Sequence, residues 1–214
     1  MNILNLKETE ISNSSYNLII GLTLFWGFLM NFLLVKFVDT STLTNINPFV
    51  FYIGYFVSCI IGIFLAHGSD NPVISFIGYN FVVIPIGLVL NIALEGVYTA
   101  VIIKALLITM LFTIEMIVLS IKFPNFFRKL GRVLFISLLS VIIFEFLFVF
   151  IIGTSSVIID VIVVSIFCLY IGYDWVKAQN SIKTVDSAID NTVNIYLDII
   201  NLFLRLVSIL NKND

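Results

Sequence analysis

Charged residues are scarce in this sequence, and their scarcity excludes a soluble domain. Of its 214 residues only 11% are charged and 60% are hydrophobic, whereas a soluble domain carries about 25% charged residues. Such a chain cannot cover itself with polar groups in water. The polar residues also gather between long apolar runs. We therefore expect the chain to form one membrane domain over residues 1–214.

Basic clusters, histidine and cysteine are also in short supply. The net charge is −2 and the basic residues are scattered, so no basic face predicts nucleic-acid binding. One histidine, His67, and two cysteines inside apolar runs cannot form a zinc cluster. A membrane-embedded hydrolase would need a metal cluster or a nucleophile beside its base. We therefore expect no enzyme and no resident cofactor.

Apolar runs long enough to cross a bilayer are what the sequence has in abundance. A helix needs about 20 apolar residues to span the hydrocarbon core, and polar or turn-forming stretches separate seven runs of this kind. The sequence thus predicts an all-α integral membrane protein with a seven-helix bundle. The expected spans are 16–38, 48–66, 73–94, 97–121, 133–152, 157–176 and 188–210.

The lysines and arginines of the loops predict the orientation, because these residues are in excess on the cytoplasmic side of membrane proteins. Lys36 and Lys212 lie on one side of the predicted bundle. We therefore expect a multi-pass protein of the cell membrane with a cytoplasmic N-terminus, unless the seventh span is re-entrant. The cytoplasmic side would hold Lys7, Lys122, Arg128, Lys129, Arg132, Lys177 and Lys183.

The seventh span carries a narrow polar stripe on an otherwise apolar helix. At 100° per residue its members fall within about 80° of one another, and Ser187 and Lys212 extend the line. The stripe either lines a polar path through the bundle or supplies interhelical hydrogen bonds. It is too narrow and too acidic for a helix lying on the membrane surface. Its members are Asn191, Asn194, Asp198, Asn201 and Arg205.

Asp198 has a candidate partner in Asp174, at the end of the sixth span. Asp198 lies about ten residues into its own span, or roughly 15 Å of helix. The two carboxylates could meet if the sixth helix continues past Asp174 or if the loop folds inward; otherwise Asp174 is a solvated end residue. A carboxylate pair in a dry site shares a proton or holds a cation, and Ca²⁺ prefers oxygen ligands.

Three further charges, Lys104, Glu115 and Glu145, lie inside apolar spans. A charge at the bilayer centre costs about 2.5–3.5 kcal/mol on insertion scales, so such residues mark function or structural pairing. Lys104 and Glu115 share a face of the fourth span but lie about 16 Å apart along it, too far to pair directly. Glu145 is in mid-span and should face the interior. For each, a functional and a structural role remain open.

Two motifs near the C-terminus resemble the signature of the transmembrane Bax-inhibitor family. The sixth span contains Leu169-Tyr170-Ile171-Gly172-Tyr173-Asp174, similar to that family's Leu-Tyr-x-x-Tyr-Asp. The seventh contains Ile195-Tyr196-Leu197-Asp198-Ile199-Ile200-Asn201-Leu202-Phe203, similar to Leu-Tyr-Leu-Asp-x-x-Asn-Leu-Phe with isoleucine in place of the first leucine. The likeness is specific over the last third of the chain.

The resemblance implies a seventh helix at the centre of the other six and a calcium leak path gated by protons. By position, Asp174 and Asp198 would be the gating and ion-binding pair, with Ca²⁺ as the permeating ion. A basic latch near the end of the second helix would hold one aspartate in the closed state, and here the nearest candidate is His67 instead of an arginine. We expect a monomer that interacts with the lipid bilayer, Ca²⁺ and protons.

The leading hypothesis is therefore a pH-sensitive, Ca²⁺-permeable leak channel. A proton-coupled transporter is one alternative, because Glu115, Glu145 and Asp198 could relay protons. A membrane scaffold or regulator that conducts nothing is another, and the polar stripe would then only hold helices together. A di-aspartyl protease is disfavoured by the position of Asp174 at the end of its span and by the family resemblance.

Overall fold

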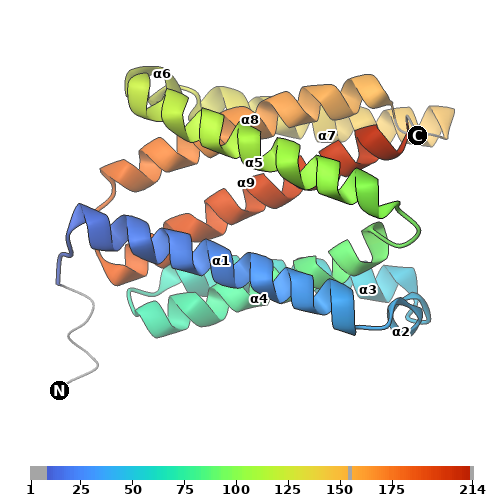
Figure 1. The fold of residues 1–214 in the computed structure, drawn as a ribbon, viewed down its shortest axis with the longest axis horizontal. Helices are drawn as coiled ribbons and strands as arrows, with labels where there is room; N and C mark the ends of the chain where they lie inside the picture. The colour runs from blue at the N-terminus through green and yellow to red at the C-terminus, as the bar shows by residue number, and fades with distance from the viewer. Residues whose placement is uncertain (1–8, 154–155, 213–214) are drawn as a thin grey trace. The chain divides into compact units, whose positions relative to one another are not determined.

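The computed structural model describes residues 9–153 and 156–212, and within these ranges the regular structure is entirely helical (Figure 1). Seven of the helices are long and apolar enough to cross a membrane. The prediction of an all-α membrane protein with seven spans is confirmed. The long helices are α1 (Asn13–Phe37), α3 (Pro48–Gly68), α4 (Pro72–Ala93), α5 (Thr99–Lys122), α7 (Gly131–Ile152), α8 (Val157–Asn180) and α9 (Val185–Asn211).

The largest departure from the expected spans lies between α8 and α9. α8 continues to Asn180 although its apolar run ends near residue 176, because the following Lys177-Ala178-Gln179 are good helix formers without being apolar. α9 begins at Val185, before the expected residue 188. The backbone N–H of Ser187 donates to Thr184 Oγ1, and the N–H of Thr184 donates to Ser187 Oγ, a reciprocal cap of the helix start. The loop is therefore short.

Two short helices occupy stretches where the sequence predicted loops: α2 (Thr40–Thr44) and α6 (Pro124–Arg128). Asp39 caps α2, since one of its carboxylate oxygens accepts from the Ser41 N–H and the other from the Ser41 hydroxyl. These hydrogen bonds lower the pKa of Asp39 below its usual range. Pro124 opens α6, where its fixed φ suits the first turn.

The described residues form two compact units. The first contains the chain up to Glu95 together with Asn180–Tyr196, and the second contains Gly96–Gln179 together with the chain from Leu197 onward. α9 contributes its N-terminal part to the first unit and its C-terminal part to the second. The expectations of one domain and of a central seventh helix concern how these units join, and they stay predictions. Lys7, used above for orientation, lies outside the described residues.

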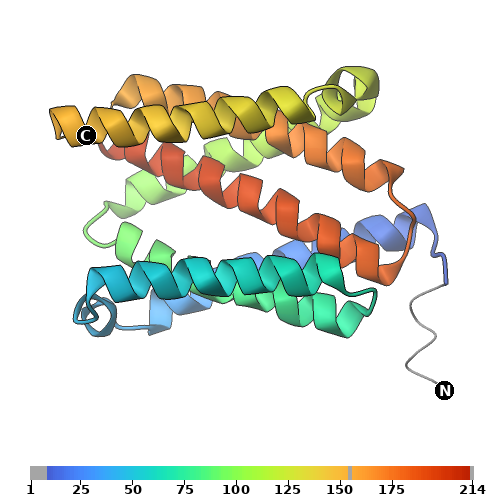
Figure 2. The ribbon, with the colours of Figure 1, turned by 180° about the vertical axis from the view of Figure 1, so that it is seen from behind.

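In the first unit, α4 packs against α1 and α3 (Figures 1 and 2). A Cβ at Gly62 of α3 would lie 2.6 Å from the backbone oxygen of Gly78 on α4, so glycine allows the two backbones to approach closely. Tyr79 and Tyr196 are fully buried in this unit. The outer faces remain apolar, with Phe49 and Phe64 both 74% exposed, as expected of surfaces that contact lipid.

In the second unit, α8 supplies much of the core while α7 exposes almost all of its apolar residues. Only Leu134 of α7 is buried, and Phe150 is 81% exposed. α8 buries residues along most of its length, including Asp160 and Asp174. Such an arrangement suits a helix that faces lipid beside one that faces protein. It places both acidic residues of α8 where side chains of α9 can meet them.

Candidate functional site

The second unit brings together the acidic pair considered from the sequence. Asp174 on α8 is 8% exposed and Asp198 on α9 is 6% exposed. The charge of Asp174 acts directly on Asp198, so the two carboxyl groups are neighbours. α8 continues six residues past Asp174, to Asn180, which is the geometry that such a meeting requires. Asp174 is therefore buried against its neighbour instead of being a solvated helix end.

One oxygen of this pair has no hydrogen-bond donor among the described residues. Oδ2 of Asp198 is buried and accepts no hydrogen bond there. Buried polar atoms are nearly always satisfied, and an exception calls for an explanation such as a proton, a water molecule or an ion. The atom therefore marks a position where something beyond the described side chains belongs.

A cation and an aromatic ring on α8 flank the pair. Lys177, one helical turn after Asp174, acts electrostatically on Asp198. Tyr170, one turn before Asp174, interacts electrostatically with both aspartates. The ring of Tyr173 lies 6.5 Å from that of Tyr170, centroid to centroid. Sequence reasoning counted Lys177 only as a loop charge, because the apolar run of the sixth span ends before it.

His67, the predicted latch, lies in the first unit and is exposed. Its Nδ1 is 3.2 Å from the carbonyl oxygen of Ile63, one turn earlier on the same helix. The pair lies in the second unit, so the latch role of His67 stays a prediction. Within the second unit, the charge of Lys177 acts on Asp198.

The remaining members of the polar stripe do different things along α9. In the first unit, the Asn191 side-chain amide donates to the hydroxyl of Tyr16 on α1 at 3.1 Å and to the carbonyl of Ser187 at 2.7 Å. Asn201 donates to the carbonyl of Leu197 on its own helix at 2.7 Å, and Asn194 is half-buried. Asn191 thus holds two helices together, while path lining by the stripe stays a prediction.

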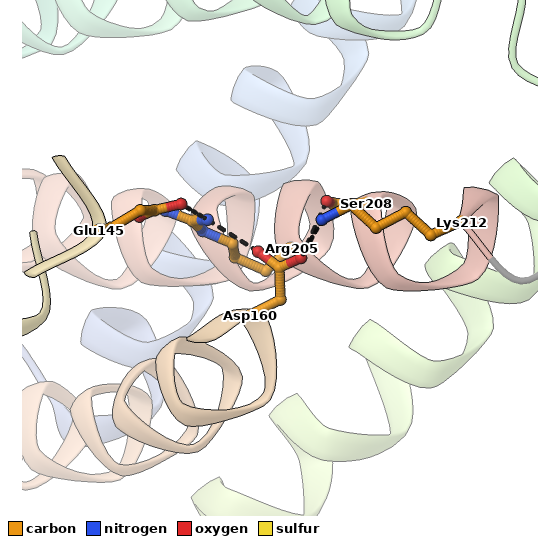
Figure 3. Close-up of polar contacts among 5 residues, drawn as sticks. All are labelled: Glu145, Asp160, Arg205, Ser208 and Lys212. Atoms are coloured by element: carbon orange, nitrogen blue, oxygen red, sulfur yellow. Dashed lines mark hydrogen bonds and ion pairs between the residues drawn. The ribbon is translucent and has the colours of Figure 1, made fainter. Parts of the chain in front are cut away.

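Arg205, at the far end of the stripe, joins three helices of the second unit through ion pairs. Its guanidinium donates to both oxygens of Glu145 on α7, each at 2.6 Å, and to Oδ1 of Asp160 on α8 at 2.8 Å. Oδ2 of Asp160 accepts from Lys212 at 2.9 Å and from Ser208 at 3.1 Å. Figure 3 shows these side chains converging on Asp160 and Arg205. The structure therefore gives Glu145 a pairing partner.

Asp160 is the residue of this cluster that sequence reasoning missed. Its side chain is fully buried and binds two cations. A signal was present in the sequence, since an aspartate in the first turn of an otherwise apolar span needs a partner. The other two intramembrane charges of α5, Lys104 and Glu115, are exposed. No ion pair joins them among the described residues.

Two further acidic residues of α9 lie in the first unit and were also missed. Oδ1 of Asp186 is 2.7 Å from the Ser75 hydroxyl of α4. Oδ1 of Asp190 is buried without a hydrogen-bond partner among the described residues. In the loop before α9, burial lowers the pKa of Lys183, whose Nζ lies 4.3 Å from the centre of the Tyr16 ring. Across the described residues, no group of three or more His, Cys, Asp or Glu side chains could hold a metal ion.

Comparison with known proteins decides the family. The family model described as "Inhibitor of apoptosis-promoting Bax1" matches residues 11–214. The chain belongs to this Bax-inhibitor family. The resemblance carried by the two C-terminal motifs is thereby confirmed, and with it a membrane protein of the Bax-inhibitor type.

The similar curated proteins add no activity. Two proteins of Helicobacter pylori, from strains ATCC 700392 / 26695 and J99 / ATCC 700824, are 33% identical to the chain over 100 residues, and both carry the name "Uncharacterized protein". The match covers 44% of this chain and 41% of each relative, so the chain spans less than half of their length in the comparison. No solved structure matches the chain.

Proposed function

We propose that the chain is a pH-sensitive, Ca²⁺-permeable leak channel of a cell membrane, gated by Asp174 and Asp198. The observation that carries the proposal is the contact between these two buried carboxyl groups, together with the unsatisfied Oδ2 of Asp198. Membership of the Bax-inhibitor family supports a membrane protein of this general type.

The chemistry of the pair follows from its burial. Two carboxylates in contact repel each other when both are ionised, and a site with little water screens that repulsion poorly. The pair therefore lowers its free energy by sharing a proton or by taking a cation. Ca²⁺ binds six to eight oxygens in typical sites. Two carboxylates supply only part of such a shell, so carbonyls and water would complete it around an ion in transit.

Lys177 gives the pair a means of closing the path. When the pair is ionised, its negative charge attracts Lys177, which lies one turn from Asp174 and acts on Asp198. Protonation removes that charge and releases the lysine. Tyr170 is another titratable group of α8 that interacts electrostatically with both aspartates. Ca²⁺ flux should therefore rise as the pH falls, with the N-terminus and this gate on the cytoplasmic side.

The proton-relay alternative receives less support from the geometry. Glu145 is held by both nitrogens of the Arg205 guanidinium, and Glu115 is exposed on α5. Neither glutamate is therefore well placed to pass a proton to Asp198. A transporter would show proton movement that depends on a second solute, which a pH-sensitive dye enclosed in the same liposomes would measure.

The test is Ca²⁺ efflux from liposomes that contain the purified protein, measured between about pH 6 and about pH 8. Asp198→Asn should remove most of the increase in flux on acidification, because the asparagine keeps the shape and cannot titrate. Glu95→Gln is the control: it removes an exposed acidic residue of the first unit and should keep the pH response. Unchanged flux and pH dependence in Asp198→Asn would falsify the gate assignment.

A further inference from the structure

Asp160 and Asp174 both contact α9, and the two contacts fit one and the same alignment of α8 along α9. Asp160 precedes Asp174 by 14 residues, and its partner Lys212 follows Asp198 by 14 residues. Moving back along α8 therefore moves forward by an equal count along α9, so the two helices are antiparallel within the second unit. Fourteen residues are about four helical turns, or roughly 21 Å.

The carboxyl pair cannot hold this register by itself. When both groups are ionised they push α8 and α9 apart, and when they share a proton they form one hydrogen bond. The intervening buried residues are apolar: they include Phe167 and Ile171 of α8 and Leu202 and Leu206 of α9. Apolar contacts discriminate weakly between a helix and the same helix moved by one turn of about 5.4 Å.

Asp160 does discriminate between registers. Its fully buried carboxylate receives Arg205 on one oxygen and Lys212 with Ser208 on the other. All three donors come from the last turns of α9, so a shift by one turn would leave a buried carboxylate without its cations. A buried charge that loses its partner is strongly destabilising. A buried polar group is the known means by which packed helices select a single register.

We propose that Asp160 is a positioning residue, and that its bonds to Arg205 and Lys212 fix the register in which Asp174 meets Asp198. We call this pair of bonds the Asp160 clamp. Only the effect of this clamp on Ca²⁺ flux rests on the proposed function. The register itself can be measured without measuring flux.

Disulfide cross-linking measures this register directly. In a background with Cys59→Ala and Cys168→Ala, the pair Asp174→Cys with Asp198→Cys reports the native register. The pair Asp174→Cys with Asn194→Cys reports a shift of about one turn. Each pair is oxidised with copper phenanthroline in liposomes, and the disulfide yield is read by mass spectrometry.

Asp160→Asn and Lys212→Met should each lower the native-register yield by about threefold or more and raise the shifted yield, because a buried carboxylate fixes a register only while its cations remain. Lys212 is at the helix end with its side chain 31% exposed, so Lys212→Met gives an answer even if Asp160→Asn does not fold. Glu145→Gln is the matched control. It removes the partner of Arg205 on α7 and leaves the bonds between α8 and α9, so both yields should stay as in the parent.

Equal yields in the parent, Asp160→Asn and Lys212→Met would overturn the proposal. An equal fall in the native-register yield of Asp160→Asn, Lys212→Met and Glu145→Gln would also overturn it, because that result would mean that the whole unit has become looser. If Asp160→Asn and Lys212→Met lose the native-register disulfide while Asp198→Asn keeps normal Ca²⁺ flux, the clamp stands and the channel gate is rejected. If Asp160→Asn and Lys212→Met keep the disulfide while Asp198→Asn loses the pH response, the gate stands and the clamp is rejected.

Discussion

Asp160 and Asp174 are both buried aspartates of α8, but their partners on α9 are opposite in charge. Asp160 meets Arg205 and Lys212, and both of its oxygens accept hydrogen bonds. Asp174 meets another aspartate, Asp198, one of whose oxygens lacks a donor among the described residues. The first arrangement is complete without a ligand, whereas the second requires a proton or a cation. The same residue type in the same helix thus meets opposite electrostatic surroundings at its two ends.

The largest effect should come from removing Asp160. Asp160→Ala leaves Arg205 and Lys212 without their shared carboxylate, and breaking a buried ion pair costs about 3–5 kcal/mol. We expect a marked fall in the Tm of the protein in detergent. Asp174→Ala should produce no comparable fall, because it removes one of two repelling groups. Similar losses of Tm in the two variants would erase the contrast between the two ends of α8.

A gain in stability, opposite to the loss in Asp160→Ala, is expected when one carboxylate of the Asp174–Asp198 pair is made neutral. Asp174→Asn should raise stability near pH 8 by about 1 kcal/mol, since it removes the repulsion between two carboxylates. The gain should shrink at about pH 6, because lower pH favours a proton on the wild-type pair. Thermal unfolding at both pH values measures the difference. A destabilised Asp174→Asn at both values would mean that the pair is held by something other than a shared proton or cation.

A loss smaller than that of Asp160→Ala is expected at Arg205 when its charge is kept. Arg205→Lys retains a cation near Asp160 but loses the two-nitrogen contact with Glu145. Paired parallel bonds of this kind depend on the planar guanidinium, and we expect a loss of about 1–2 kcal/mol. The fall in Tm should therefore lie between those of Glu145→Gln and Asp160→Ala. A fall as large as that of Asp160→Ala would make the α7 contact as important as the α8 contact.

The smallest effect should come from Asp39, an exposed aspartate with neutral donors. Its pKa is lowered by the hydrogen bonds from Ser41, so the cap of α2 is present at neutral pH and is lost as the pH falls below the usual range of aspartate. Asp39→Ala should speed amide hydrogen exchange at Ser41 and Thr42 at neutral pH and leave global stability unchanged. Slow exchange in the variant would contradict the cap.

The number and type of the spans were readable from the sequence, because a bilayer imposes about 20 apolar residues on each helix. The pair of Asp174 and Asp198 was also within reach, since a carboxylate inside the seventh span needs a partner and Asp174 ends the neighbouring apolar run. The contact itself depended on where α8 ends, and hydropathy places that end too early. Helix propensity in residues 177–179 and the cap at Thr184 decide it instead.

The partners of Asp160 were out of reach for a different reason. Arg205 was assigned to the polar stripe and Glu145 was noticed as a mid-span charge, but ion pairs between helices depend on their register, which no single helix reveals. Lys177 was likewise treated only as a charge of the loop, and its effect on Asp198 was not predicted. Charge partners across helices are a property of packing, and only the assembled second unit shows them.

Infrared difference spectroscopy with Ca²⁺ tests the central claim most directly. If the pair exchanges a proton for a cation, wild-type protein at about pH 6 should show a protonated carboxyl band that decreases when Ca²⁺ is added. The band should be absent from Asp198→Asn and present in Glu145→Gln. A wild-type spectrum without that band, or a band that survives in Asp198→Asn, would contradict the account.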